Sequence, residues 1–379
     1  MRERILAASV ALLACSVGFS SNADAAPTVE IVHSFAPGEA RYPGSEATLV
    51  QGPGNMLYGV SQLGGQADKG TVYSFNTRTG RFKQLHSFSR PDGGDVFPQA
   101  VAVGPAGEIL VTTYQGGSHD YGTIYLANPM GGAVEIHSFD GADIGRPVGR
   151  LVAYDGYFYG TGYASWGSVF RFDVQGNTEL LHAFPSPYSS PDEAQPFGLS
   201  AGAPGVFYGA TWGWYAPPQS HGAVYSLNAD GQYAVMHFFN GADGSRPFYA
   251  PVRASDGNLY GTTAEGGPNP DACGVVYRLT PTGTFDVFHS FDFLVDGCSP
   301  MGGLLPASNG KLYGVNGAGV FYVINPATQR FRVLLRLDQI TGGPESIQSA
   351  LIETAPRVFY GVSSSGGQYG QGTIYKIKL

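Results

Sequence analysis

The fold is decided by the stretch GTVYSF (70–75), a polar turn (76–80) and the stretch FKQLHSF (82–88). Both apolar halves are rich in β-branched and aromatic residues, and the turn carries Asn, Thr and Gly, so the segment predicts an antiparallel hairpin. Its second half recurs along the chain, which indicates a repeat architecture. Further copies of this strand lie at 29–35, 133–139, 178–184, 233–239, 285–291 and, in degenerate form, 331–337.

A second hairpin lies between successive copies of the first. Its marker is a Leu-Tyr-Gly or Phe-Tyr-Gly triplet, which occurs at 57–59, 158–160, 207–209, 259–261, 312–314 and 359–361, while the second unit reads Ile-Leu-Val at 109–111. A short apolar strand and a tight turn precede each copy. Each unit therefore holds four short strands and spans about fifty residues, close to the period of four-stranded propeller blades.

The two ends of the repeated region indicate how the repeats close. The region begins with a fourth-type strand at 29–35 and ends with a third-type strand at the C-terminus, so the two ends complete one blade. Closure pairs strands that would otherwise be open edges. We therefore predict an all-β fold, a seven-bladed β-propeller of four-stranded blades, with strand 29–35 completing the last blade.

The N-terminal segment resembles a secretory signal. Arg2 and Arg4 precede an apolar run, and small residues at 23–25 suit signal peptidase, so we expect a signal peptide over 1–25 and one propeller domain over 26–379. The alternative is a lipoprotein attached through Cys15. No other run reaches the ~20 apolar residues of a membrane span. We therefore expect a secreted or periplasmic monomer.

Charge and cysteine content narrow the range of partners. The 379-residue chain has a net charge of −8 and no basic run, which argues against nucleic acid as a partner. After signal removal two cysteines remain, Cys273 and Cys298. In an oxidising compartment we expect them to form a disulfide, with a reactive thiol or a metal site as the alternatives.

The repeat units resemble the GloVer tandem repeat family of secreted bacterial proteins. The resemblance rests on the His-Ser-Phe strand, the Asp-Gly-rich crossing before proline, the Leu-Tyr-Gly strand, and Gly-Gly before Gly-Thr-Val-Tyr. These elements recur in a fixed order over essentially the whole mature chain. The resemblance implies a secreted or surface propeller and no particular activity, because members usually have none assigned.

Six of the eight histidines occupy one repeated strand position, so we expect them to satisfy neighbouring blades rather than to bind one substrate. They are His33, His86, His137, His182, His237 and His289. His119 and His221 instead lie in long loops between the second and third strands of blades two and four. Blade geometry puts these loops on the same face as the blade crossings, where binding residues are expected. Each is a candidate catalytic base, with a solvated loop histidine as the alternative.

Aromatic residues also gather off the repeat. Trp166 follows Tyr163 in the loop of blade three, and Trp212, Trp214 and Tyr215 occupy the loop of blade four. Exposed aromatic rings cost free energy unless they pack or bind. They are candidates for stacking on sugar rings, with packing among themselves as the alternative, and Tyr163 is also a candidate acid or base.

Arg146, Gln195 and Arg246 each precede a proline where a crossing enters an innermost strand. A guanidinium at this position could hold a substrate carboxylate. The alternative is an ion pair with Asp143 or Asp243, three residues before each arginine. The Asp- and Gly-rich crossings themselves indicate turns, so we expect no cofactor, with structural calcium as the alternative.

Two functions follow from these residues. The first is a carbohydrate-active propeller. In its more specific form it is a lyase that cleaves an extracellular, uronic-acid-containing polysaccharide by β-elimination. An arginine would bind the uronate carboxylate as a clamp, and a His or Tyr would act as the base. A glycoside hydrolase would instead need paired carboxylates, for which Asp143, Asp243, Glu265 and Asp271 are available. The second is a propeller that binds glycan or protein without catalysis. A base and an arginine that converge on one cleft would favour the lyase.

Overall fold

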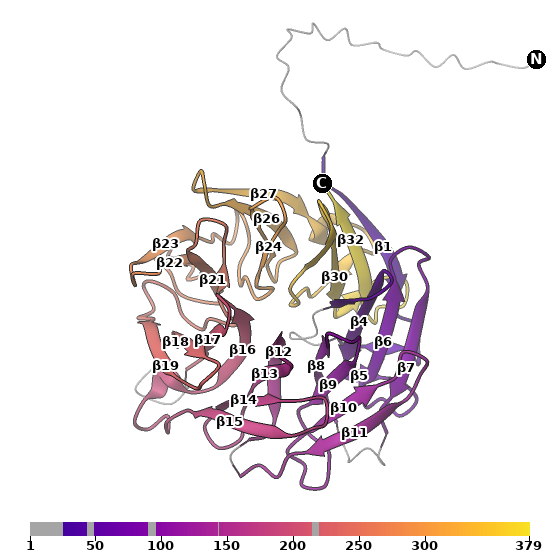
Figure 1. Ribbon diagram of the computed structural model, residues 1–379. Helices are drawn as coiled ribbons and strands as arrows, with labels where there is room; N and C mark the ends of the chain where they lie inside the picture. Colours follow the sequence, from indigo (N-terminus) through magenta and orange to yellow (C-terminus); the bar gives the residue numbers. More distant parts are fainter. Residues whose placement is uncertain (1–25, 44–48, 90–95, 143, 214–219) are drawn as a thin grey trace, which may run out of the picture.

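The computed structural model describes residues 26–43, 49–89, 96–142, 144–213 and 220–379. Seven four-stranded antiparallel sheets stand around one axis and form a ring (Figure 1). The prediction of a seven-bladed propeller is confirmed. The expected signal peptide, Cys15, Asp143, Trp214 and Tyr215 lie outside the described residues.

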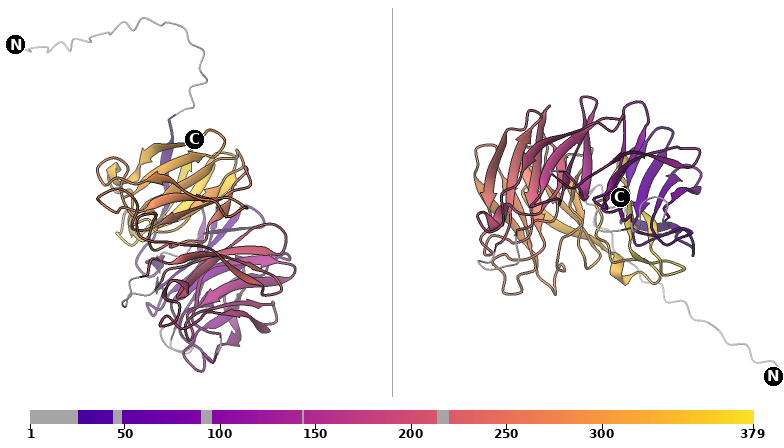
Figure 2. Two further views of the ribbon diagram at one scale, coloured as in Figure 1. Left: turned by 90° about the vertical axis from the view of Figure 1, so that its left-hand side faces the viewer. Right: turned by 90° about the horizontal axis from the view of Figure 1, so that it is seen from below.

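The blades follow one another in chain order around the ring (Figure 1), which Figure 2 shows from two sides. Blade 1 contains β3 (Val50–Gly52), β4 (Met56–Ser61), β6 (Thr71–Asn76) and β7 (Phe82–Ser87), and blade 2 contains β8 (Pro98–Val103), β9 (Ile109–Thr113), β10 (Thr123–Ala127) and β11 (Ala133–Ser138). Blade 3 contains β12 (Pro147–Tyr154), β13 (Tyr157–Gly162), β14 (Ser168–Phe172) and β15 (Thr178–Ala183), and blade 4 contains β16 (Pro196–Ala201), β17 (Val206–Thr211), β18 (Ala223–Asn228) and β19 (Tyr233–Phe238).

Blade 5 contains β20 (Val252–Arg253), β21 (Leu259–Thr263), β22 (Val275–Leu279) and β23 (Phe285–Ser290), and blade 6 contains β24 (Leu304–Pro306), β25 (Leu312–Val315), β26 (Val320–Asn325) and β27 (Arg330–Arg336). Blade 7 combines β29 (Ile352–Ala355), β30 (Val358–Ser363), β32 (Thr373–Lys378) and the N-terminal β1 (Thr28–Ser34). Short pairs β2 (Ala40–Arg41) with β5 (Leu63–Gly64) and β28 (Pro344–Glu345) with β31 (Ser365–Gly366), and the 3₁₀ turns η2 (Pro191–Glu193) and η3 (Leu337–Gln339), lie in the connections.

The ring closes through β1 and β32, which pair antiparallel with Val29 opposite Ile377 and Ile31 opposite Tyr375. The chain's first described strand is thus the outermost strand of its last blade (Figure 1). Without β1, the C-terminal strand β32 would be the open edge of blade 7, and pairing with β1 covers that edge.

The Tyr-Gly motif has a steric cause. Gly261 lies opposite Tyr277 on the neighbouring strand, and a Cβ added to Gly261 would lie 2.2 Å from the Tyr277 hydroxyl. Only glycine leaves room for the ring there. The same arrangement joins Gly59 with Tyr73, Gly209 with Tyr225, Gly314 with Tyr322, and Gly361 with Tyr375. In blade 2 the position is Val111, and Tyr125 instead reaches toward Glu135.

The repeated histidines connect neighbouring blades. His237 stacks on Phe285, the first residue of the outermost strand of the next blade, with ring centroids 3.7 Å apart, while its Nε2 lies 3.0 Å from Asp243 of the crossing. His33 on Phe82, His182 on Tyr233 and His289 on Phe331 stack in the same way. The stacking agrees with a structural role for these histidines, although the Nε2 of His182 has no hydrogen-bond partner among the described residues. Burial lowers the pKa of His137, His182 and His237 from the ordinary value.

Candidate functional site

One backbone arrangement recurs at the inner end of every blade, on the face that carries the long loops. The last crossing residue before the innermost strand has a left-handed conformation, with φ between 44° and 61°. Its carbonyl accepts the N–H of a residue that follows the second strand. The seven loop pairs are Tyr42 with Gln62, Phe97 with Tyr114, Arg146 with Tyr163, Gln195 with Trp212, Arg246 with Ala264, Ser299 with Gly317, and Ser346 with Ser364.

The loop pairs place two residues of each blade around the central axis on a common backbone, and in blade 6 one of the two is Gly317, which has no side chain. Side chains other than glycine adopt this conformation at a cost, and six of the seven crossing residues precede proline, which restricts them further. Such strain is held by surrounding structure and is common at functional sites. The fold therefore fixes the backbone of this ring, and the side chains alone distinguish one blade from another.

Blades 3 to 5 present Arg146, Gln195 and Arg246 at equivalent places in this ring. The guanidinium carbon of Arg146 lies 5.4 Å from the ring centre of Tyr114 and 5.3 Å from that of Tyr121. Tyr163, which pairs with Arg146 through the backbone, lies edge-on to Tyr114 at 6.3 Å. Arg146 and Tyr163 thus belong to one cluster, in which cation–π contacts hold the arginine.

His119 lies apart from that cluster. Its side chain is exposed, and its Nδ1 lies 3.3 Å from Ser118, whose hydroxyl contacts Ser138 at the end of the outermost strand of blade 2. Within the described residues, no contact joins His119 to Arg146. The structure therefore does not bring this base candidate to an arginine.

His221 and Arg246 do share one cleft. The cleft has a volume of about 450 Å³ and is lined by Ser220, His221, Gly241, Ser245, Arg246, Glu265, Gly266 and Ala272. Nη1 of Arg246 lies 2.7 Å from Oε1 of Glu265, and its guanidinium carbon lies 5.8 Å from the ring centre of Trp212. Nδ1 of His221 lies 3.1 Å from the Ser245 hydroxyl. A guanidinium, an imidazole and a carboxylate therefore meet in one place.

The alternative partner expected for Arg246 was wrong. Asp243 accepts from His237 and from the N–H of Asn240 at 2.8 Å, so its carboxylate is engaged in the crossing turn. Glu265 reaches Arg246 because two backbone hydrogen bonds join it to Ser245, next to the arginine. The turn-forming interpretation of the crossing aspartates agrees with this arrangement. Across the residues that the structure describes, no three His, Cys, Asp or Glu side chains come together as a metal site.

Asp192 is a further residue of this site, and it was not singled out from the sequence. Its Oδ1 accepts the N–H of His221 at 2.7 Å and that of Gly222 at 3.2 Å. The carboxylate lies in η2, in the crossing that enters blade 4, and it fixes the loop that carries His221. A Pro-Asp-Glu turn in a crossing is a weak signal, because any exposed turn can have that composition.

An aromatic cluster lies beside the cleft. Trp212 packs edge-on against Phe248 at 5.6 Å, Phe248 contacts Phe197 at 4.4 Å, and Phe197 contacts Tyr163 at 6.3 Å. Phe197 and Phe248 follow the prolines of the crossings and were not predicted as site residues. Packing against Phe248 therefore accounts for part of the burial of the Trp212 side chain.

Trp166 lies outside this cluster. It is 41% exposed and meets the exposed Tyr188 edge-on at 6.2 Å. Tyr188 belongs to the crossing from blade 3 to blade 4. Trp166 and Tyr188 therefore form an exposed aromatic pair on the loop face. No described contact joins this pair to Arg246.

Cys273 and Cys298 form a disulfide, with Cα atoms 4.6 Å apart. The bond joins the loop of blade 5 to the crossing into blade 6, and the N–H of Ser299 donates to the Cys273 carbonyl at 3.0 Å. Disulfides are typical of proteins outside the cytoplasm. Within the described ranges, no helix is long and apolar enough to cross a membrane.

Comparison with solved structures shows the fold alone. The extracellular domain of a hybrid two-component system from B. thetaiotaomicron matches at a TM-score of 0.59 and 13% identity over 92% of this chain, which spans only 41% of that protein. An oligogalacturonate lyase from Vibrio parahaemolyticus matches at 0.55 and 12% identity, over 93% of this chain and 97% of the lyase. YCF48, bound to a D1 peptide, matches at 0.54 and 12% identity, over 92% and 96%.

We found no significant match among curated proteins. The Gloeobacter/Verrucomicrobia repeat model, in contrast, matches residues 17–216 and 214–379. These two matches cover nearly the whole chain and all seven blades. The resemblance of the repeat units to this family is confirmed, and the chain belongs to the Gloeobacter/Verrucomicrobia repeat (GloVer) family.

Proposed function

We propose that this chain is a secreted carbohydrate-active propeller that cleaves an extracellular, uronic-acid-containing polysaccharide by β-elimination. The observation that carries the proposal is the cleft in which Arg246, His221 and Glu265 meet. The oligogalacturonate lyase of similar fold adds support by analogy only, because propellers of one shape host many functions.

Arg246 is the group that would bind the uronate carboxylate. In the elimination, a base removes the C5 proton next to this carboxylate, the C4=C5 double bond forms, and the glycosidic oxygen at C4 leaves. Negative charge grows on the carboxylate as the proton leaves, so a bound guanidinium lowers the barrier. Glu265 holds Arg246 before substrate arrives, and its half-exposed side chain can turn into solvent when a second carboxylate takes its place.

His221 is the candidate base. When its Nδ1 proton is donated to Ser245, the lone pair of Nε2 is available to accept the substrate proton. Asp192 holds the backbone of this residue in place. Trp212, against which Arg246 lies, would offer its remaining surface to a sugar ring.

A hydrolase receives less support from the same cleft. Glycoside hydrolysis requires two carboxyl groups about 5 to 10 Å apart across the substrate. Glu265 is the one carboxylate among the described lining residues. Of the other candidates, Asp271 is exposed and Asp243 is engaged with His237, and neither lines the cleft.

The test is incubation with uronic-acid and neutral polysaccharides while the absorbance of unsaturated product and the reducing ends are followed. We expect Arg246→Ala to reduce turnover by about 10²–10³-fold and His221→Gln by about 10²–10⁴-fold. Arg171→Ala is the matched control, because Arg171 also pairs with a glutamate, Glu179, and lies 4.5 Å from the ring centre of Tyr157. Turnover that survives Arg146→Ala/Arg246→Ala would refute the clamp.

The second candidate is a propeller that binds glycan or protein without catalysis. It is favoured by the Arg246–Glu265 pair, which already satisfies the cation, and by the packing of Trp212 on Phe248. In that case the wild-type protein would be retained on an acidic glycan and release no unsaturated product. Arg246→Ala would abolish retention, while His221→Gln would leave it unchanged.

A further inference from the structure

A second, smaller cavity lies on the axis of the ring. Blades 3 to 7 contribute to its wall, which includes Arg150 of blade 3, Leu199 and Ser200 of blade 4, Tyr249 and Ala250 of blade 5, and Leu304 of blade 6. Its volume is about 20 Å³, which suits one or two water-sized particles. A sugar cannot enter such a space, so the cavity is distinct from the cleft at Arg246.

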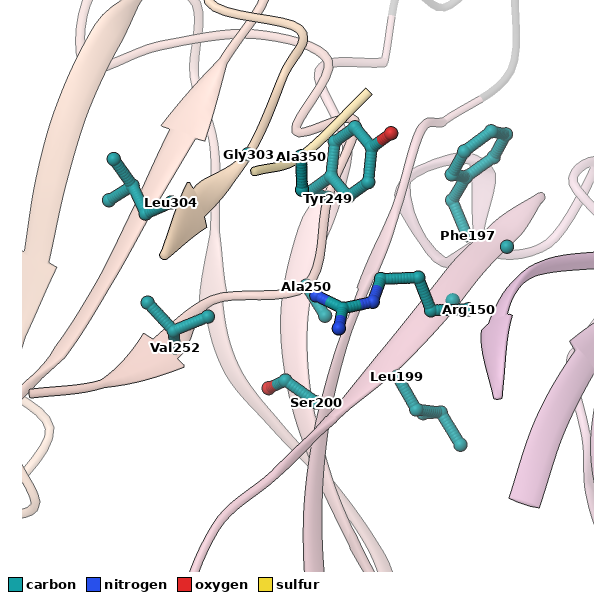
Figure 3. Close-up of a pocket in the computed structure, with 12 residues that line it drawn as sticks. Arg150, Phe197, Leu199, Ser200, Tyr249, Ala250, Val252, Gly303, Leu304 and Ala350 are labelled. Atoms are coloured by element: carbon teal, nitrogen blue, oxygen red, sulfur yellow. The ribbon is translucent and has the colours of Figure 1, made fainter. Parts of the chain in front are cut away.

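Arg150 is the one charged residue among the described lining residues, and its side chain lies across the middle of the cavity toward Ala250 (Figure 3). Across the described ranges, no hydrogen bond or ion pair engages its guanidinium. A guanidinium stays protonated inside proteins, so the charge remains there. Desolvation lowers the pKa of Arg150, and Tyr249 alone acts in the opposite direction.

The backbone aims this arginine inward. The pairing of β12 with β13 is interrupted between Val148 and Val152, so residues 149–151 bulge from the innermost strand. Gly149, with φ of 70°, contacts Gly198 of the next blade so closely that an added Cβ would lie 2.4 Å from the Gly198 Cα. Bulges of this kind redirect side chains. Neighbouring blades present the apolar Leu199, Ala250 and Leu304 instead.

The polar groups of the wall do not neutralise the charge. The Ser200 hydroxyl donates to the Pro251 carbonyl, and the Tyr249 hydroxyl donates to the Gln348 carbonyl at 3.0 Å. None of the described lining residues carries a carboxylate. Arg150 is partly buried. A cation that is partly removed from water without a counter-charge is unfavourable, and a small anion would supply one.

We infer that the axial cavity binds one small monovalent inorganic anion of the halide class, held by the Arg150 guanidinium. Carboxylates and phosphates exceed the space, whereas a halide approaches the size of a water molecule. The anion would join the bulge of blade 3 to blades 4 and 5, and its binding would stabilise the folded ring.

Bromide is the probe, because it has the charge of chloride and scatters anomalously. Urea unfolding is followed while bromide replaces gluconate at constant ionic strength. Once bromide exceeds its dissociation constant, the equilibrium constant for folding should rise tenfold for each tenfold rise in bromide. Arg150→Met keeps the side-chain length without the charge, and its folding constant should not depend on bromide.

A crystal of the wild-type protein grown in bromide gives an independent readout. We expect an anomalous peak within hydrogen-bonding distance of the Arg150 guanidinium. A water molecule in that position at saturating bromide would overturn the inference, as would equal bromide dependence in the wild type and Arg150→Met. The crystal experiment decides even if the variant fails to fold.

Discussion

The hydroxyl of Tyr277 gives a direct test of how the blades pack. Tyr277 is fully buried over Gly261, and within the described residues its hydroxyl has no hydrogen-bond partner. Burial raises its pKa well above the ordinary value, so the group stays neutral. An unsatisfied buried hydroxyl costs about 1–3 kcal/mol. We therefore expect Tyr277→Phe to stabilise the protein by up to that amount.

One smaller term opposes this gain. Removing one oxygen leaves a small void, at about 24 cal/mol per Å³ of cavity, which is less than the desolvation cost that it relieves. The ring itself keeps its contacts with Phe239 and Phe285. The net change should remain stabilising.

Tyr260→Phe is the matched control in the same blade. Tyr260 is equally buried, but its hydroxyl donates to the Asp256 carboxylate at 2.9 Å. Loss of a hydrogen bond to a charged group costs about 1.5–3 kcal/mol. Urea unfolding of both variants should move the midpoint in opposite directions. A midpoint for Tyr277→Phe that falls as far as that of Tyr260→Phe would refute the argument and indicate a hydrogen-bonded hydroxyl.

Three further outcomes are expected. Gly261→Ala should destabilise the fold by about 1–3 kcal/mol through overpacking, because the new Cβ would meet the Tyr277 ring; thermal unfolding checks this. Cys298→Ser should cost about 3.5 kcal/mol in the chain-entropy account for a 25-residue separation, and thiol titration of the unfolded wild type should find both cysteines oxidised. His137, His182 and His237 have lowered pKa values, so the unfolded chain takes up their protons first. The contribution of these histidines to stability should be fully present above about pH 6.5, the ordinary pKa of histidine, and should be lost on acidification. Urea midpoints measured as a function of pH should fall less on acidification in His182→Gln than in the wild type.

The sequence predicts the ring well because every blade repeats the same local pattern. The glycine of the Tyr-Gly motif contacts a tyrosine of the same blade, as Gly261 contacts Tyr277. The histidine of the repeated strand stacks on a residue of the next blade, as His237 stacks on Phe285. The equivalence of Arg146, Gln195 and Arg246 was also visible, because each marks the same junction before proline.

The partners of the candidate site could not be predicted in the same way. Asp243 is nearer to Arg246 in sequence, but the repeat engages it with His237, and Glu265 reaches the arginine through a loop pairing between distant segments. Arg150 was missed for a related reason. Strict alternation along β12 does not reveal a three-residue bulge, and the bulge decides that a cation faces the axis. Glu265 belongs to blade 5 and Arg150 to blade 3, and neither residue is part of the repeated pattern. The repeat therefore predicts the fold of these blades but not the charged groups that they carry.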